Sequence, residues 1–320
     1  MRLLLLLALL LPGCAMQATR PALDRDWVAG RTWVVTGAAS GIGRGVAERA
    51  GALGANVVLA DIRADALEPL AAIIRASGGQ ALAVPTDVSD AAAVERLAVA
   101  AEARFGAIAV WFNNAGIAVL GRFDEIPAEE HARVMAVNLG GALHGSGSAL
   151  RRFRARGEGV LLNMASVEAR IPLAYHASYA ATKAGILGLD GALRQELRLA
   201  GLGRVRVITV MPWTVDTPFW ENTGNRTGRQ PTGPWMDSAR DVADSIVWAA
   251  LHRPSGEFPV GPKAEAAVLG GQFFPLPSQA AAASIIHRMQ MENAPPAPPT
   301  SGTLFRPGTG VPRVEGGFRR

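Results

Sequence analysis

The chain has 320 residues, of which 49% are hydrophobic and 18% charged, a composition typical of a globular protein with a buried core and not of a disordered chain. Its net charge of +5 comes from arginines that are scattered singly, apart from short clusters at 151–156 and 319–320, and no basic helix with interleaved aromatic residues indicates nucleic-acid binding. The single cysteine, Cys14, and five scattered histidines exclude an intramolecular disulfide, a cysteine-rich zinc site and any familiar metal-binding spacing.

The first 20 residues are typical of a leader. The segment MRLLLLLALLLPGCAMQ has one positive charge and an apolar run too short to span a bilayer, as in the hydrophobic part of a secretory signal. Its Leu-Pro-Gly-Cys stretch resembles a lipoprotein signal in which Cys14 is lipidated, which predicts membrane association through residues 1–20. The alternative is that translation begins at Met16. Both interpretations exclude residues 1–20 from the fold.

Seven apolar runs alternate with longer Ala-rich segments from residue 31 onward. The runs are rich in Val, Ile and Leu without strict polar alternation, which is typical of strands buried on both faces of a parallel sheet. Because helical patterns separate the runs, βαβ units with right-handed crossovers are expected. The sequence therefore predicts an α/β fold, with one doubly wound, Rossmann-type domain over residues 28–262 and a mostly seven-stranded parallel sheet. The predicted strands are 31–37, 56–61, 81–87, 108–116, 159–166, 204–212 and 258–261, and the predicted helices are 41–53, 64–77, 90–105, 128–155 and 178–200.

Residues 263–320 form a C-terminal extension of different character. Residues 263–292 contain an apolar segment and a helix, whereas residues 293–320 are rich in Pro and Gly. We expect this last part to be a poorly ordered tail that lies along the domain surface. An arm that joins copies of the chain in an oligomer is the alternative.

A glycine-rich turn, TGAASGIG at 36–43, directly follows the first predicted strand and opens a helix. Glycine permits a tight turn and lets backbone N–H groups approach a pyrophosphate, whose charge the helix N-terminus favours. Asp61 ends the second strand, where a carboxylate can accept hydrogen bonds from both ribose hydroxyls of an adenosine and would repel a 2′-phosphate. Arg63 could instead receive that phosphate, so NAD is favoured and NADP stays open. The candidate binding residues of the turn are Gly37, Ser40, Gly41, Ile42 and Gly43.

Together with two further motifs, the glycine-rich turn and Asp61 make the chain resemble the short-chain dehydrogenase/reductase family over about residues 30–262. The glycine spacing is similar to that of the non-extended branch of the family. The sequence NNAG at 113–116 resembles its sheet-stabilising motif, and TDVS at 86–89 resembles its adenine contact. The resemblance implies that the adenine ring is bordered by Asp87 and Val88 and that the ribose lies near Asn114.

The stretch SYAATKAG at 178–185 places Lys183 four residues after Tyr179, in a chain with only two lysines and two tyrosines. Positions i and i+4 of a helix share a face, so both side chains can point into one cleft. Hydride transfer from an alcohol carbon needs a base for the hydroxyl proton, and a tyrosine with a pKa of about 10 is a poor base at neutral pH. Because a nearby ammonium stabilises the phenolate, we expect Lys183 to lower the pKa of Tyr179. A surface pair without a role in chemistry is the alternative.

Two more polar residues match catalytic positions of the family. Ser166 closes a predicted strand thirteen residues before Tyr179, and its hydroxyl can hydrogen-bond a substrate oxygen and stabilise developing charge. By position alone, Ser166 could also be an ordinary turn residue. Asn138, inside a predicted helix, corresponds by resemblance to the residue that holds a water linking Lys183 to solvent. The resemblance also implies contacts with the nicotinamide carboxamide from Val215 and Thr217.

The chain departs from the family pattern after the sixth strand, where Pro-Trp at 212–213 replaces the usual Pro-Gly. Trp213 puts a large indole where the family has no side chain. With Phe219 and Trp220 nearby, it favours an apolar substrate. The alternative is that these aromatic side chains only pack against the following helix.

These residues predict an NAD(P)-dependent alcohol dehydrogenase or ketone reductase that acts on a small molecule, an apolar secondary alcohol or its ketone. Tyr179 is the expected acid and base, Lys183 tunes it and binds the nicotinamide ribose, Ser166 orients the substrate, and Asn138 completes the proton relay. The alternatives are an NADPH-preferring ketone reductase and a non-catalytic NAD-binding scaffold at the membrane. Because nicotinamide cofactors are abundant in cytoplasm, we expect a cytoplasmic homo-oligomer, with a lipoprotein anchored through Cys14 as the alternative.

Overall fold

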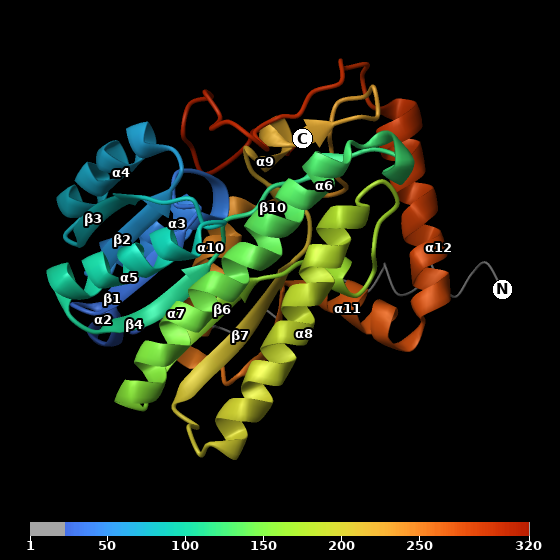
Figure 1. Ribbon diagram of the computed structural model, residues 1–320. Helices are drawn as coiled ribbons and strands as arrows, with labels where there is room; N and C mark the ends of the chain where they lie inside the picture. The colour runs from blue at the N-terminus through green and yellow to red at the C-terminus, as the bar shows by residue number, and fades with distance from the viewer. Residues whose placement is uncertain (1–22, 320) are drawn as a thin grey trace.

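The computed structural model describes residues 23–319, and the leader with its Cys14 and Met16 lies outside them. Within the described chain, a seven-stranded sheet has the order β3-β2-β1-β4-β6-β7-β11, and all neighbouring strands are parallel (Figure 1). The prediction of a doubly wound α/β fold is therefore confirmed. The strands are β1 (Thr32–Thr36), β2 (Asn56–Asp61), β3 (Gln80–Pro85), β4 (Ile108–Asn113), β6 (Gly159–Met164), β7 (Val205–Pro212) and β11 (Gly256–Val260), and short strands outside this sheet are β5 (Val119–Leu120), β8 (Val215–Asp216), β9 (Gly224–Asn225) and β10 (Asp237–Ser238).

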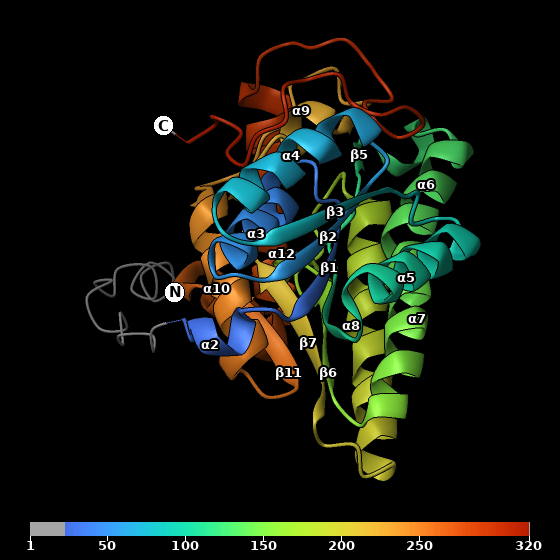
Figure 2. The same ribbon diagram turned by 90° about the vertical axis from the view of Figure 1, so that its left-hand side faces the viewer.

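Helices cover both faces of the sheet, which explains why its middle strands are continuously apolar (Figure 2). Helices α3, α4 and α10 enclose one core with Trp33, and α5, α7 and α8 enclose the other with Trp111. Both indoles are fully buried, so truncating either one is expected to cost about 3–5 kcal/mol of stability. The helices of the domain are α2 (Arg25–Val28), α3 (Gly41–Ala52), α4 (Ala64–Ala76), α5 (Ala91–Phe105), η1 (Phe123–Glu125), α6 (Ala128–Met135), η2 (Ala136–Gly140), α7 (Gly141–Arg156), η3 (Val167–Ala169), α8 (Ala177–Leu199), α9 (Phe219–Asn222) and α10 (Ala239–His252).

The helix predicted over 128–155 consists of α6 and α7 joined by the π-helical segment η2. A π-helical turn adds a residue to the helical turn and is frequent at functional sites. Asn138 lies at the centre of η2 and is 2% exposed. The π-helical turn therefore places the Asn138 carboxamide in the interior of the protein and not in solvent.

The C-terminal extension packs along the domain. Its helices are α11 (Pro262–Phe273), α12 (Pro275–Ile286) and the π-helical η4 (His287–Asn293), and the tail that follows runs past α9 (Figure 1). Leu304 and Val314 of the tail are 1% and 3% exposed. The backbone N–H of Gly41 donates to the Arg313 carbonyl at 2.9 Å. The expectation of a poorly ordered tail is therefore wrong, because buried apolar side chains and backbone hydrogen bonds hold this segment on the domain.

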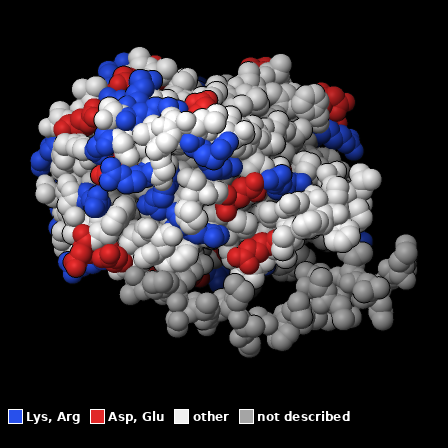
Figure 3. Space-filling model, turned by 90° about the horizontal axis from the view of Figure 1, so that it is seen from below, with Lys and Arg blue, Asp and Glu red and all other residues white. Residues whose placement is uncertain are grey.

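Acidic side chains accompany the basic ones on the surface. Figure 3 shows one face of the molecule, on which Lys and Arg lie interspersed with Asp and Glu. In the sequence cluster at 151–156, Arg151 pairs with Glu95 at 2.6 Å, and Arg154 pairs with Glu196 at 3.1 Å. The arginines of this cluster are thus engaged in ion pairs on helix faces, the pattern of a solvated surface.

Candidate active site

The carboxyl ends of the parallel strands open into a large cavity, the position at which doubly wound sheets bind ligands. The cavity has a volume of about 1210 Å³. Asp61 at the end of β2, Asn114 after β4, Ser166 after β6 and Trp213 after β7 all line it. The strand topology thus brings together residues that are up to about 150 positions apart in the sequence.

The glycine-rich turn forms one end of this cavity. Gly37 and Gly41 have φ values of +64° and +58°, which only glycine adopts readily. A Cβ added to Gly43 would lie 2.2 Å from the Gly37 carbonyl oxygen, so this glycine serves the packing of α3 against β1. Among the predicted residues of the turn, Gly37, Ser40, Gly41 and Ile42 line the cavity and Gly43 does not.

Asp61 is fixed between two backbone N–H groups. Its carboxylate accepts hydrogen bonds from the N–H of Ala39 and of Arg63, both at 3.0 Å. Burial raises the pKa of Asp61 despite these hydrogen bonds. The Arg63 guanidinium is turned elsewhere, since it donates to Asp65 at 2.8 Å and to the Gly310 carbonyl of the tail at 2.6 Å. At this end of the cavity, the Asp61 carboxylate is therefore the group that a ligand hydroxyl would meet. The nearby Arg63 guanidinium already has partners.

The residues expected near adenine and ribose also line the cavity, and two of them carry structural bonds. The Asp87 carboxylate pairs with Arg133 at 3.0 Å and accepts a hydrogen bond from the Ser89 hydroxyl. Burial acts to raise the pKa of Asp87, but the bonds with Ser89 and Arg133 outweigh burial and lower this pKa. The Asn114 amide donates to the carbonyls of Thr36 and Gly37 at 2.9 Å and 3.2 Å. Asn114 therefore ties the end of β4 to the glycine turn. Val88 lines the cavity beside Asp87.

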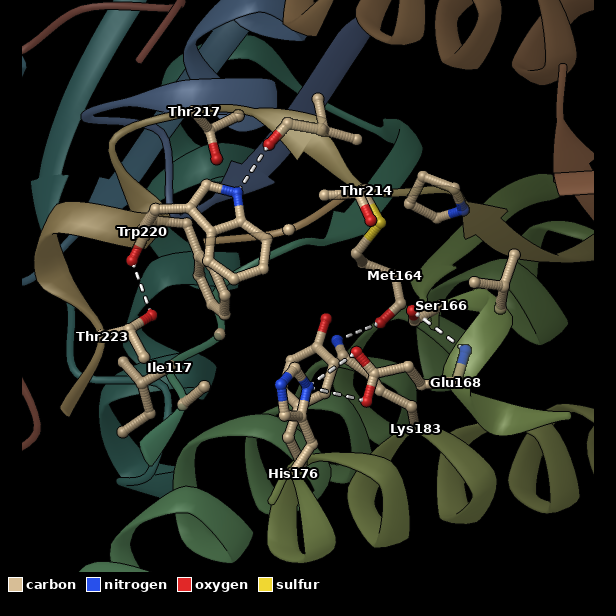
Figure 4. Close-up of a pocket in the computed structure, with 18 of the residues that line it drawn as sticks. Ile117, Met164, Ser166, Glu168, His176, Lys183, Thr214, Thr217, Trp220 and Thr223 are labelled. Carbon is tan, nitrogen blue, oxygen red and sulfur yellow. Dashed lines mark hydrogen bonds and ion pairs between the residues drawn. The ribbon is translucent and has the colours of Figure 1, made fainter. Parts of the chain in front are cut away.

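Tyr179 and Lys183 lie one turn apart on α8 and both line the cavity. The Lys183 Nζ is 5.3 Å from the centre of the Tyr179 ring and donates to the Met164 carbonyl at 2.6 Å. Lys183 is 2% exposed, and its burial lowers its pKa to about 8 although the Glu168 carboxylate opposes this shift. Figure 4 shows Met164, Ser166, Glu168, His176 and Lys183 gathered on one side of the cavity.

Tyr179 keeps its proton in this environment. Burial and the charge of Glu168 raise the pKa of Tyr179 well above its ordinary value of 10, and a hydrogen bond with Ser166 only partly offsets this. The expected lowering of this pKa is not met by the protein residues by themselves, because burial and the Glu168 charge outweigh the Ser166 hydrogen bond. Surrounded by protein groups alone, Tyr179 is a proton donor.

Asn138 connects the loop after β4 with α8. Its Oδ1 accepts from the N–H of Ile117 at 2.8 Å, and its Nδ2 donates to the Ile117 carbonyl at 2.9 Å and to Thr182 Oγ1 at 3.2 Å. A Cβ added to Gly116 would lie 3.5 Å from Asn138 Oδ1 and 3.8 Å from Lys183 Nζ. Asn138 lines a small cavity beside the main one. Gly116 thus leaves room between the carboxamide and the ammonium.

The aromatic residues after β7 line the cavity and also pack within the protein. Trp213 Nε1 donates to the Pro234 carbonyl at 3.0 Å, and Trp220 Nε1 donates to the Val215 carbonyl at 3.0 Å. The Phe219 ring lies 5.8 Å from that of Tyr179. Figure 4 shows Trp220 and Thr217 across the cavity from Lys183. These aromatic side chains therefore line the cavity and also bond within the protein, and Val215 and Thr217 line the cavity too; the apolar substrate stays a prediction.

The cavity also contains residues that the sequence reasoning missed. Glu168 and His176 form a buried ion pair at 3.1 Å, and Gln290 of η4 contacts the other nitrogen of His176. The positions of Glu168, two residues after Ser166, and of His176, three residues before Tyr179, could have marked them as neighbours of the site. No sequence signal points to Gln290, which is 114 positions from His176.

The described part of the chain has no group of three or more His, Cys, Asp or Glu side chains arranged to hold a metal ion. None of its helices combines the length and the apolar character needed to cross a bilayer.

Comparison with known proteins gives concordant results. The sequence profile of the short chain dehydrogenases matches residues 31–227. The probable oxidoreductase EphD of Mycobacterium tuberculosis is 38% identical over 270 residues, which are 80% of this chain and 45% of EphD, so the chain spans about half the length of that relative. The 3beta-hydroxysteroid dehydrogenase 1 of Eggerthella lenta is 38% identical over 241 residues, covering 72% of this chain and 90% of the relative.

A solved structure resembles the fold over most of the domain. The crystal structure of a short chain dehydrogenase/reductase from Burkholderia phymatum in complex with NAD superposes with a TM-score of 0.69 and 30% sequence identity, covering 76% of this chain and 92% of that one. The profile match spans more than half of the chain and includes the glycine turn, Ser166, Tyr179 and Lys183. The chain therefore belongs to the short-chain dehydrogenase family of oxidoreductases, enzymes that act on alcohol groups.

Proposed function

We propose that this protein transfers a hydride between NAD and a secondary alcohol or ketone on an apolar skeleton. The observation that carries the proposal is the meeting of Ser166, Tyr179 and Lys183 on one wall of a cavity that extends to Asp61 and the glycine turn. The cavity is large enough for a dinucleotide and a cyclic substrate together, since pockets for single ligands measure about 300–1,000 Å³. Its substrate end includes Ile171, Trp213, Phe219 and Ile285, which supports an apolar substrate.

The residues at the other end fit a dinucleotide. Gly41 and Ile42 in the first turn of α3 line the cavity, where a helix N-terminus suits a pyrophosphate. The N–H of Gly41 would have to leave the Arg313 carbonyl to take part. Asp61 offers a carboxylate to ribose hydroxyls and would repel a 2′-phosphate. NAD is proposed over NADP because the Arg63 guanidinium is bound by Asp65 and the Gly310 carbonyl and would have to leave both to meet a phosphate.

The proposed reaction transfers one proton and one hydride. In reduction, Tyr179 Oη gives its proton to the carbonyl oxygen while the hydride reaches the carbonyl carbon. Oxidation reverses both transfers and requires that Tyr179 has first released its proton through the relay. A bound nicotinamide would supply the hydride acceptor or donor, and Val215 and Thr217 would contact its carboxamide. Ser166 hydrogen-bonds the reacting oxygen and stabilises its developing charge. Lys183, held by the Met164 carbonyl, keeps a positive charge beside Tyr179, and Asn138 orients a relay toward Lys183.

The protonated state of Tyr179 favours the reductive direction. Ketone reduction needs a proton donor at the carbonyl oxygen, and burial together with Glu168 raises the pKa of Tyr179 so that its proton is retained. A ketone reductase is therefore the second candidate function, and it could use NADPH only if Arg63 left Asp65 and the Gly310 carbonyl to meet the phosphate. Dissociation constants of NADH and NADPH, measured by fluorescence titration, separate the two candidates.

Replacing Tyr179 by Phe tests the proposal. Tyr179→Phe removes only the hydroxyl, so kcat is expected to fall about 10³-fold or more while NADH binding stays within about twofold of the wild type. Tyr175→Phe is the matched control, because Tyr175 is the other tyrosine of the chain and its hydroxyl contacts His287 at 2.7 Å. Wild-type turnover by Tyr179→Phe, with a panel of cyclic ketones, would refute the assignment and leave an NAD-binding scaffold as the better explanation.

We also propose that the protein works as a homo-oligomer in the cytoplasm. Exposed Phe273, Phe274 and Leu276, at 65%, 66% and 77%, support a contact between copies through α11 and α12. The need for a nicotinamide cofactor supports the cytoplasm. Light scattering after gel filtration measures the assembly, and mass analysis of the native N-terminus distinguishes lipidated Cys14 from a start at Met16.

A further inference from the structure

A charged pair that the proposed reaction does not use lies at the substrate end of the cavity. Glu168 follows Ser166 by two residues in η3, and His176 precedes α8, three residues before Tyr179. Figure 4 shows both side chains beside Ser166 and Lys183. The backbone N–H of Glu168 donates to Ser166 Oγ at 3.2 Å, so the carboxylate belongs to the turn that holds the serine.

The pair is buried and charged. Glu168 and His176 are 9% and 3% exposed, and His176 Nδ1 lies 3.1 Å from both carboxylate oxygens of Glu168. Burial acts to lower the pKa of His176, but the Glu168 carboxylate more than compensates and the pKa is raised. The raised pKa favours the protonated imidazole, which pairs with the Glu168 carboxylate at 3.1 Å.

The imidazole is held at both of its nitrogens. Gln290 of η4 contacts His176 Nε2 at 3.0–3.2 Å and donates from its own amide to the Thr232 carbonyl at 2.9 Å. Gln290 is 1% exposed. With the ring fixed between Glu168 and Gln290, the carboxylate keeps one orientation relative to Ser166.

The Glu168 carboxylate has acceptor capacity to spare. An ionised carboxylate can accept about four hydrogen bonds, and among the described residues only His176 donates to its oxygens. Both side chains line the cavity, so the carboxylate lies beside the space in which a substrate would bind. A buried ion pair contributes little to stability compared with an apolar pair of the same volume, so stability alone does not explain its presence.

We propose that Glu168 is a specificity-determining residue that accepts a hydrogen bond from a second hydroxyl on the substrate, close to the carbon that reacts at Ser166 and Tyr179. His176 is the positioning residue that holds the carboxylate. The inference rests on the proposed function, because it takes the reacting carbon from it. The substrate class is then a cyclic, largely apolar diol or its hydroxyketone. A site built to bind a hydroxyl discriminates strongly against the analogue that lacks it, since the buried acceptor is left unpaired.

Three alcohols that differ by a single hydroxyl test this inference. The probes are cyclohexanol, cyclohexane-1,2-diol and cyclohexane-1,3-diol, oxidised with NAD by the full-length wild type and its variants. We expect kcat/KM for at least one diol to exceed that for cyclohexanol by about 10-fold or more. Glu168→Gln, which keeps the shape of the side chain, is expected to remove this preference through KM for the diol. The readout is the ratio of kcat/KM for the diol to kcat/KM for cyclohexanol, because removing the charge also acts on Tyr179 and changes the rate for every alcohol alike. Glu168→Met, which is apolar and of similar length, should also lose the preference for the diol.

Two further variants separate a local effect from a general one. Glu265→Gln, an exposed position in the first turn of α11, makes the same chemical change outside the cavity and should keep the diol preference. His176→Asn should raise KM for the preferred diol more than KM for cyclohexanol, because it leaves the carboxylate in place without the ring that holds it. If Glu168→Gln lowers kcat/KM for all three alcohols equally, or if the wild type does not prefer a diol, the inference is overturned.

Binding distinguishes a failure of this inference from a failure of the proposed function. Saturation-transfer NMR of the same alcohols measures selectivity without turnover. Diol-selective binding that Glu168→Gln abolishes supports the inference even if no alcohol is oxidised, an outcome that would contradict the proposed reaction alone. Equal binding of the three alcohols overturns the inference whatever the turnover.

Discussion

Gly116 provides a test in which stability and activity are expected to change in opposite directions. A Cβ added at this position would lie 3.5 Å from Asn138 Oδ1, 3.8 Å from the Asn114 carbonyl oxygen and 3.8 Å from Lys183 Nζ. These are ordinary contact distances, and Gly116 is not among the glycines with positive φ, so an alanine fits without strain. Its methyl group would occupy the space that three polar atoms surround, and three such partners are what a bound water requires.

The magnitudes follow from this geometry. Replacing a glycine by alanine in a compatible conformation reduces the entropy of the unfolded chain, so Gly116→Ala is expected to raise the free energy of unfolding by about 0.4–1 kcal/mol. Excluding water from between Asn138 and Lys183 interrupts the proposed proton relay, and kcat is expected to fall about 10²-fold, within the range that positioned proton transfer contributes. NADH binding should change less than kcat, because the added methyl group lies between Asn138 and Lys183 and removes no polar group from the cavity.

Three measurements decide this prediction. Absorbance of NADH at saturating substrate gives kcat, fluorescence titration gives the dissociation constant of NADH, and urea denaturation gives the free energy of unfolding. Gly188→Ala on α8 is the matched control, since an added Cβ there meets no atom within 4 Å. The reasoning is refuted if Gly116→Ala keeps kcat within twofold of the wild type, or if its loss of activity is accompanied by a loss of stability.

Further predictions concern the cofactor, the pH dependence of stability and the tail. Asp61→Asn removes the charge that repels a 2′-phosphate, so the ratio of the NADPH and NADH dissociation constants should fall about 10-fold in fluorescence titrations; an unchanged ratio would count against Asp61 as the discriminating group. Burial raises the pKa of Asp190 from 3.8 to about 6, so its contribution to stability is present below pH 4 and lost as the pH rises through 6. In urea denaturation, the free energy of unfolding of Asp190→Asn relative to that of the wild type should therefore rise by about 2–3 kcal/mol between pH 4 and pH 8. The exposed Asp124→Asn should show no such trend. Val314→Ala removes a buried anchor of the tail and should speed tryptic cleavage after Arg313 about 5–30-fold, and equal cleavage rates would show that the tail is held elsewhere.

The fold could be predicted because its signals are local. Each strand of the sheet is a short apolar run, and the observed bounds, such as Asn56–Asp61 and Gly159–Met164, lie within a few residues of the predicted ones. The glycine turn and the spacing of Tyr179 and Lys183 are also local patterns. The topology of a doubly wound sheet then brings the strand ends together, which is why Asp61, Asn114 and Ser166 share one cavity.

Some features of the site could not be derived from local patterns. The contact of Gln290 with His176 joins residues 114 positions apart, and the bond from Gly41 to Arg313 joins the glycine turn to the tail. Neither contact leaves a spacing in the sequence, because each depends on how the C-terminal extension packs on the finished domain. For the same reason the tail was expected to be poorly ordered, although its few apolar residues are enough to fix it.

The sequence by itself determined the sheet, the family and the choice of residues that we propose as reacting groups, since these depend on residue types at short spacing and on the order of elements. Only the tertiary structure decided the electrostatics of the site. The i, i+4 spacing brings Lys183 to Tyr179, but the pKa of Tyr179 depends on burial and on Glu168, whose charge reaches it through space. Burial and the distance between charges are properties of the packed molecule, and they set whether Tyr179 holds or releases its proton.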